Sequence, residues 1–360
     1  MRNICLIIIS ALLSIASYGC MSREDDEFVL PGGDFAVTSP HGLLIVNEGN
    51  FQYGNSSLSY YDPTDMKVTN ELFQKVNGMR LGDVAQSMTV YDGTGWIVVN
   101  NSHVIFAVDI KTLREKGRIT DLTSPRYIHF VNNRKAYVTQ LWDNRIYIVD
   151  PATYSVTGTI TVDGMQQQSG STERMVQIGE YVYVTCWSYQ RDLLKIDSST
   201  DRITDRLDVG FQPGPLVKDF AGNLWTITDG GYSGSPAGSG IPALVCIDPE
   251  SMTVIRRLEF KQGSSPRQLA TDSSGHTLYF INQDLYEMDA DDSSLPVKPL
   301  VSGDNRLFYA LSVDPVNGDI YLSDAIDYTQ QGVVYRFSPD GVQTDKFYAG
   351  VNPACFCWIP

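Results

Sequence analysis

Large aromatic side chains and arginines lie between the β-rich runs of this sequence, where they are available to contact a ligand. Aromatic rings offer broad apolar surfaces, and an arginine offers five N–H donors to the amide or phosphate oxygens of a small molecule. Each aromatic residue could alternatively cap its own sheet, but the whole set predicts a binding site. The predicted contact residues are Phe51, Tyr53, Arg126, Trp142, Arg174, Trp187, Tyr189, Tyr232, Arg267 and Tyr328.

Catalytic and metal-binding motifs are missing from the sequence. Its four histidines, at positions 41, 103, 129 and 276, form neither an HxH nor an HExxH spacing. The run 231–235 lacks the G-x-S-x-G spacing of a nucleophile elbow, and Asp314, Asn317 and Asp319 suit a hairpin turn better than a calcium loop. We therefore expect no enzyme, cofactor or metal site, although carboxylates inside a channel would still permit a hydrolase or lyase.

Seven copies of one β-rich pattern organise the chain around these residues. Each copy ends a strand in Asp-Pro or a related pair, and six intervals separate the first such marker at position 62 from the last at position 338, a mean of 46 residues. Each marker follows a run of branched and aromatic residues such as Ala136-Tyr137-Val138-Thr139-Gln140, which favours strands over helices. A repeat of this length indicates a propeller or a solenoid.

The four strands expected in each copy predict an all-β fold, a seven-bladed β-propeller. In the third copy, the strands are expected over residues 125–131, 136–140, 145–150 and 155–162. The first copy begins at its second strand, 41–48, and lacks a strand before it. The segment 352–358 parallels the first strands of other copies, so we expect it to complete blade one and close the ring.

The connections within the predicted blades differ between the two faces of the ring. Those between first and second strands are tight and carry hairpin signals such as Asp92-Gly93. Those between second and third strands vary, and they are longest in blades one, five and seven. The aromatic contact residues lie in these variable loops, and the arginines are expected in adjoining turns between blades. A rigid ring that presents variable loops is typical of a binding surface.

The first 40 residues predict export and a membrane anchor. One positive charge and a short apolar run are typical of a secretory signal, here over residues 1–19. Ser17-Tyr18-Gly19-Cys20 resembles a bacterial lipobox, which implies lipidation of Cys20. Segment 20–40 is interpreted as a tether, and its four acids at 24–27 resemble the tag that sends lipoproteins to the outer face of the outer membrane. The alternatives are a cleaved signal with a free Cys20 thiol and a plain solvated linker. The propeller is expected over residues 41–360.

The acidic composition limits the partners of the mature chain. The sequence has 27 basic and 42 acidic residues, and removal of residues 1–19 takes away one arginine, which changes the net charge from −15 to −16. Nucleic acid is therefore not an expected partner. No later apolar run is long enough to span a bilayer, so membrane contact is expected only through the lipid. Cys186, Cys246, Cys355 and Cys357 are expected to be buried apolar residues rather than disulfides.

The runs Tyr137-Val138-Thr139 and Tyr183-Val184-Thr185 resemble the YncE-like, or YVTN-repeat, family of propellers. The lipobox, the acidic tag, and Val46-Asn47-Glu48-Gly49-Asn50-Phe51 with Ser59-Tyr60-Tyr61-Asp62-Pro63 are similar to the BtuG group of surface lipoproteins in Bacteroides-like bacteria. That resemblance implies a protein that binds a corrinoid, cobalamin (vitamin B12), and hands it to a TonB-dependent outer-membrane transporter. The alternatives are a glycan- or protein-binding adhesion module and a channel-site hydrolase or lyase.

Overall fold

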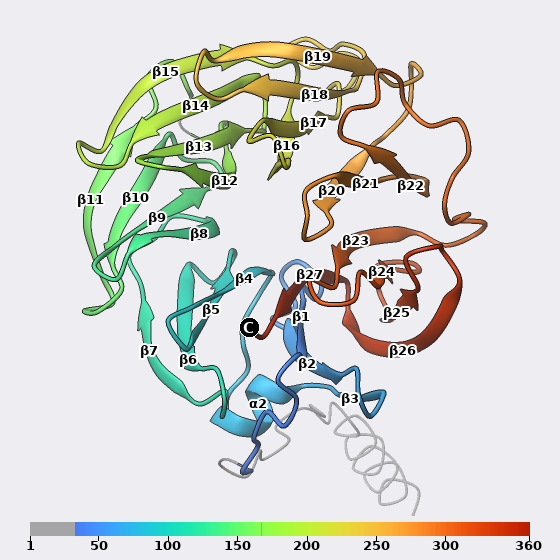
Figure 1. Ribbon diagram of the computed structural model, residues 1–360. Helices are drawn as coiled ribbons and strands as arrows, with labels where there is room; N and C mark the ends of the chain where they lie inside the picture. Colours follow the sequence, from blue (N-terminus) through green and yellow to red (C-terminus); the bar gives the residue numbers. More distant parts are fainter. Residues whose placement is uncertain (1–32, 167) are drawn as a thin grey trace, which may run out of the picture. The chain divides into compact units, whose positions relative to one another are not determined.

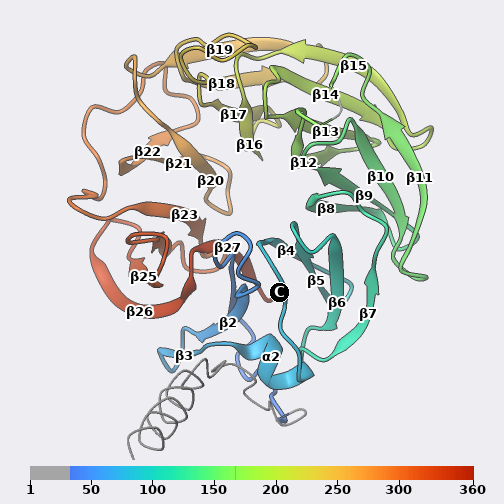
Figure 2. The same ribbon diagram turned by 180° about the vertical axis from the view of Figure 1, so that it is seen from behind.

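Residues 33–166 and 168–360, the part of the chain that the computed structural model describes, form seven antiparallel β-sheets arranged in a ring (Figures 1 and 2). The all-β propeller predicted from the repeats is confirmed. The predicted signal peptide, Cys20 and the acidic tag lie outside the described residues. No helix in the described ranges is long and apolar enough to cross a membrane.

The strands of each blade follow one another from the centre of the ring outward (Figure 1). Blade one consists of β27 (Pro353–Trp358), β1 (Leu43–Asn47), β2 (Ser57–Asp62) and β3 (Lys67–Thr69). Blade two consists of β4 (Ala85–Tyr91), β5 (Thr94–Val99), β6 (Val104–Asp109) and β7 (Glu115–Ile119). Blade three consists of β8 (Pro125–Asn132), β9 (Lys135–Gln140), β10 (Arg145–Asp150) and β11 (Ser155–Thr161).

The second half of the ring repeats this plan. Blade four consists of β12 (Thr172–Ile178), β13 (Tyr181–Cys186), β14 (Asp192–Asp197) and β15 (Arg202–Asp208). Blade five consists of β16 (Pro213–Lys218), β17 (Leu224–Thr228), β18 (Ala243–Asp248) and β19 (Thr253–Glu259). Blade seven consists of β23 (Phe308–Val313), β24 (Ile320–Asp324), β25 (Gln331–Phe337) and β26 (Gln343–Val351).

Blade six departs from the predicted four strands. It contains three, β20 (Arg267–Thr271), β21 (Thr277–Asn282) and β22 (Asp284–Asp289), and beyond them only Val301 forms an isolated bridge, to Leu285. The segment where a fourth strand would run contains Pro296 and Pro299. Proline has no backbone N–H to donate, so this segment cannot complete a regular ladder.

Each junction between neighbouring blades contains its own apolar cluster. Side chains alternate along a strand, so Leu44 and Val46 of β1 pack toward blade two, whereas Leu43 and Ile45 pack toward blade seven. Both faces of a blade are therefore buried, which explains why the second strands read as continuous apolar runs. The helix of the described part, α2 (Leu72–Asn77), adds three buried side chains to the junction of blades one and two.

The ring closes as the sequence predicts. Strand β27 pairs antiparallel with β1, with Cys355 opposite Val46 and Trp358 opposite Leu43. The innermost edges of the blades are further satisfied by side chains of neighbouring blades; for example, Asn100 Nδ2 donates to the Pro125 carbonyl over 3.0 Å. The prediction for the four body cysteines is confirmed, because all four are free and buried.

Candidate ligand-binding site

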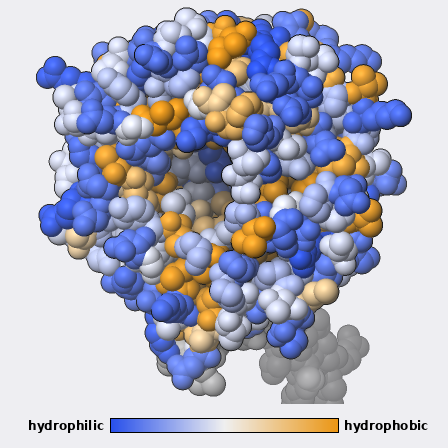
Figure 3. Space-filling view, viewed as in Figure 1, coloured by the Kyte–Doolittle hydropathy of each residue, from blue (hydrophilic) through white to orange (hydrophobic). Residues whose placement is uncertain are grey.

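Three adjoining recesses open at the centre of the ring, which the space-filling view shows as a hollow (Figure 3). Their volumes are about 300, 380 and 530 Å³, and Arg126 lines all three. Loops between second and third strands and the first residues of the innermost strands form the walls. We refer to the three recesses together as the channel-mouth site. Its size falls within the range of small-molecule sites.

Most of the predicted contact residues meet at the channel-mouth site. The residues that line it are Phe51, Arg126, Trp142, Arg174, Trp187, Tyr189, Arg267 and Tyr328. Tyr53 does not line it, and its side chain is 75% exposed. Tyr232 does not line it either, but contacts Tyr189: the two hydroxyls lie 3.2 Å apart, and the rings meet edge to face.

The three arginines occupy positions other than those expected. Arg126, Arg174 and Arg267 belong to the first residues of the innermost strands β8, β12 and β20, rather than to turns between blades. They still reach the predicted face, because each innermost strand begins beside the loops that connect second and third strands.

A β-bulge near the start of each innermost strand shapes the site. In all seven blades, the register between the first and second strands shifts at this point. A bulge leaves residues outside the ladder and redirects their side chains. The bulge residues that line the site are Gln86, Arg126, Tyr127, Glu173, Arg174, Gly214, Pro215, Gln268, Tyr309 and Ala354.

Arg126 is held in place by neighbours on both sides. Its Nε lies 3.0 and 3.1 Å from the two carboxylate oxygens of Glu173, and its Nη1 donates to Gln86 Oε1. Both partners of the ion pair are largely buried, with side-chain exposures of 16% for Arg126 and 5% for Glu173. Burial lowers the pKa of Arg126, but the charge of Glu173, its hydrogen bond with Arg126 and the nearby Tyr127 and Glu48 together raise the pKa by more. Arg126 therefore remains charged, and its contacts orient it before any ligand arrives.

Glu48 is a second buried carboxyl group of the site. It accepts a hydrogen bond of 2.5 Å from the hydroxyl of Tyr309. Burial raises the pKa of Glu48, and the Tyr309 hydrogen bond and the charge of Arg126 oppose this only in part. A carboxyl group in such surroundings holds a proton more readily than a solvated one, so Glu48 is the group of the site best suited to proton transfer.

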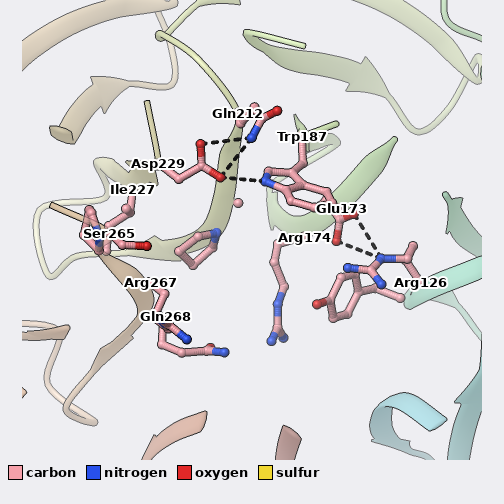
Figure 4. A pocket seen from close by; sticks show the side chains of 14 residues that line it. Arg126, Glu173, Arg174, Trp187, Gln212, Ile227, Asp229, Ser265, Arg267 and Gln268 are labelled. Atoms are coloured by element: carbon pink, nitrogen blue, oxygen red, sulfur yellow. Dashed lines mark hydrogen bonds and ion pairs between the residues drawn. The ribbon is translucent and has the colours of Figure 1, made fainter. Parts of the chain in front are cut away.

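Asp229 orients the ring of Trp187, which lines the channel-mouth site (Figure 4). Its carboxylate accepts hydrogen bonds from Trp187 Nε1 over 3.0 Å and from Gln212 Nε2 over 3.0 Å. It also accepts one from the backbone N–H of Gly231 over 2.7 Å, which anchors the long loop 229–242. The Trp187 ring is thus fixed, so it would lose little conformational freedom when it contacts a ligand.

His129 and the acidic turn of blade seven make hydrogen bonds within the fold. His129 hydrogen bonds to Gln177 over 2.9 Å, and burial lowers its pKa. The Asp314 carboxylate accepts from the backbone N–H of Val316, as expected of a hairpin turn. Within residues 33–166 and 168–360, no group of three or more His, Cys, Asp or Glu side chains is placed to hold a metal ion.

Sequence reasoning missed several residues of the site, among them Glu48, Gln86, Glu173, Asp229 and Tyr309. Three of them, Gln86, Glu173 and Tyr309, are bulge residues. The signal that could have found these three is positional, because each follows the first residue of an innermost strand.

The sequence from residue 41 to residue 346 matches the family described as domain of unknown function DUF5074. The chain belongs to this family. A comparison with curated proteins gives no match. Many solved structures resemble the ring. The three that follow are under 25% identical to this chain, so they establish its fold alone.

Three of these structures show how closely other rings resemble this one. A quinonprotein alcohol dehydrogenase-like protein from Bacteroides thetaiotaomicron is 14% identical, with a TM-score of 0.68 over 89% of this chain and 79% of that chain. The periplasmic gluconolactonase of Pseudomonas aeruginosa is 15% identical, with a TM-score of 0.65 over 89% and 99%. A putative 6-phosphogluconolactonase from Bacteroides fragilis is 13% identical, with a TM-score of 0.65 over 91% and 100%.

Proposed function

We propose that this DUF5074 propeller is a cell-surface lipoprotein of the YncE-like, BtuG type that binds a corrinoid at its channel-mouth site and hands it to a TonB-dependent outer-membrane transporter. The observation that carries the proposal is the convergence of all predicted contact residues except Tyr53 and Tyr232 on one set of recesses. These residues come from five blades, and only a closed ring brings them together.

The chemistry of the channel-mouth site suits a broad ligand with an apolar face and an amide rim. Phe51, Trp142 and Trp187 offer large, rigid apolar surfaces. Gln86 and Gln268 supply amide groups that can both donate and accept hydrogen bonds. A corrinoid combines an extended ring with peripheral amides. Its ring matches the aromatic side chains of the site, and its amides match the two glutamines.

The proposed location follows from the chain's first residues. Lipidation of Cys20 would hold the protein on the outer membrane, and the acids at 24–27 support a position facing the cell exterior. A ligand-binding ring on this surface would need a transporter to move its ligand inward. We therefore propose a TonB-dependent transporter as the protein partner and the lipid as the only membrane contact.

Titration of the purified mature protein with cyanocobalamin tests the proposal. We expect saturable heat in calorimetry and a change in the visible spectrum of the corrinoid. Trp187→Ala should weaken binding, because Trp187 lines two of the recesses, whereas Tyr348→Ala should not, because Tyr348 is exposed on the outermost strand β26. The absence of heat and of a spectral change with the unaltered protein would reject the corrinoid.

A hydrolase or lyase is the second candidate, and the raised pKa of Glu48 is the observation that favours it. Two of the similar structures are described as a gluconolactonase and a putative 6-phosphogluconolactonase. Hydrolysis of glucono-lactones can be followed by acid release. A rate above the spontaneous one that disappears in Glu48→Gln would favour this candidate, and a rate equal to the spontaneous one would count against it.

A further inference from the structure

Two arginines of the channel-mouth site have side chains without a polar partner in the described part of the chain. Neither Arg174 nor Arg267 takes part in an ion pair or a side-chain hydrogen bond there, although both line the recesses of about 300 and 530 Å³. The guanidinium of Arg174 lies only against an aromatic face, 4.2 Å from the centre of the Tyr127 ring. Figure 4 shows the Arg174 side chain extending into the open space between Arg126 on one side and Arg267 and Gln268 on the other.

The carboxylates of the site are already engaged elsewhere. Glu173 is paired with Arg126, Asp229 accepts hydrogen bonds from Trp187 and Gln212, and Glu48 accepts one from Tyr309. None of the three therefore satisfies Arg174 or Arg267. Two cationic groups facing one recess repel each other, and an anion between them would remove that repulsion.

We propose that Arg174 and Arg267 form a subsite for a phosphate group of the ligand, with the side chain of Gln268 beside it. A guanidinium presents parallel N–H donors that match two oxygens of a phosphate, and such charge-assisted bonds are stronger than neutral ones. The inference rests on the proposed function in one respect: the phosphodiester of cobalamin would be one such group. A free phosphate monoester offers the same chemistry.

Inorganic phosphate tests the subsite without a corrinoid. Binding to the mature protein is measured by ³¹P NMR line broadening and by the rise in melting temperature, at constant ionic strength with NaCl. We expect Arg174→Gln and Arg267→Gln each to weaken phosphate binding about tenfold or more, since each removes charged hydrogen bonds. The control is Arg202→Gln on the outermost strand β15, which should bind as the unaltered protein does. Phosphate stabilises many proteins nonspecifically, and a rise that is equal in all variants would overturn the subsite.

A pair of corrinoids separates the subsite from the proposed function. Cobinamide lacks the nucleotide and its phosphodiester, so the unaltered protein should bind cobalamin more tightly than cobinamide, and both glutamine variants should lose that preference. Equal affinity of the unaltered protein for the two corrinoids would overturn the subsite while the corrinoid function stands. Phosphate binding that depends on Arg174 and Arg267, with no binding of either corrinoid, would support the subsite and reject the corrinoid function.

Discussion

Trp358 of the closing strand β27 links the last part of the chain to the first, so its removal should destabilise the entire ring. Its ring meets Tyr321 of blade seven edge to face, with 5.1 Å between ring centres. Its Nε1 also donates to Ser312 Oγ over 2.9 Å. A strand that holds the ring closed contributes to every blade, because an open ring would expose two sheet edges.

The size of the effect follows from these contacts. Truncation of a buried Phe or Trp to Ala costs about 3–5 kcal/mol, and Trp358 is partly exposed, so we expect about 3 kcal/mol. Unfolding entropy of about 2 cal/mol/K per residue gives roughly 0.7 kcal/mol/K for a ring of this length, so the melting temperature of Trp358→Ala should fall by about 4 °C.

The matched control is Trp142→Ala, because Trp142 is 50% exposed at the channel mouth. An exposed substitution of this kind should change stability by about 0.5 kcal/mol or less. Both variants are compared with the unaltered protein by circular dichroism during heating. A melting temperature of Trp358→Ala within 1 °C, or about 0.7 kcal/mol, of the control would refute the role of β27 as the closing strand.

Three other predictions concern the anchor, the site and pH. Cys20 should be lipidated and the protein exposed, so proteinase added to intact cells should remove it; survival in intact but not in lysed cells would place it inside. The double substitution of Trp187 and Tyr189 by Ala should weaken cyanocobalamin binding by about 2–4 kcal/mol in calorimetry, while Tyr348→Ala leaves it unchanged; an unchanged affinity of the double variant would contradict this placement of the site. Burial raises the pKa of Glu48 above its ordinary value of 4.5. Protonated Glu48 therefore contributes to the stability of the folded protein below pH 4.5, and this contribution is lost as the pH rises through the raised pKa. Above pH 4.5 the melting temperature of Glu48→Gln should therefore rise relative to that of the unaltered protein. If the melting temperatures of the two proteins change in parallel with pH, the raised pKa of Glu48 is contradicted.

All the blades except blade six, and the closure of the ring, were predictable because they depend on local residue preferences. Branched and aromatic residues at high density form strands, and the tight turn Asp92-Gly93 joins β4 to β5 as expected. The missing strand of blade one had one matching segment, at the other end of the chain, and β27 occupies it. The third-strand markers also predicted which loops share a face, because alternate connections of a blade emerge on opposite sides of the ring.

The site was predicted only in part, because its polar residues depend on the register of strands. Loop aromatics such as Trp142 and Trp187 stand outside the strand pattern and were therefore visible in the sequence. Gln86, Glu173 and Tyr309 are at the starts of innermost strands, and a bulge rather than the residue type directs them to the site.

The sequence alone determined the number of repeats, the closure of the ring and the face that carries the variable loops, since each follows from patterns within one repeat or between its copies. Only the tertiary structure decided which charges meet. Glu173 and Arg174 are adjacent in sequence, yet Glu173 binds Arg126 of the preceding blade, whereas Arg174 reaches the open channel without a carboxylate partner in the described residues. The reason is geometric: neighbouring residues of a strand point in different directions, and their partners belong to other blades that only the closed ring brings within reach.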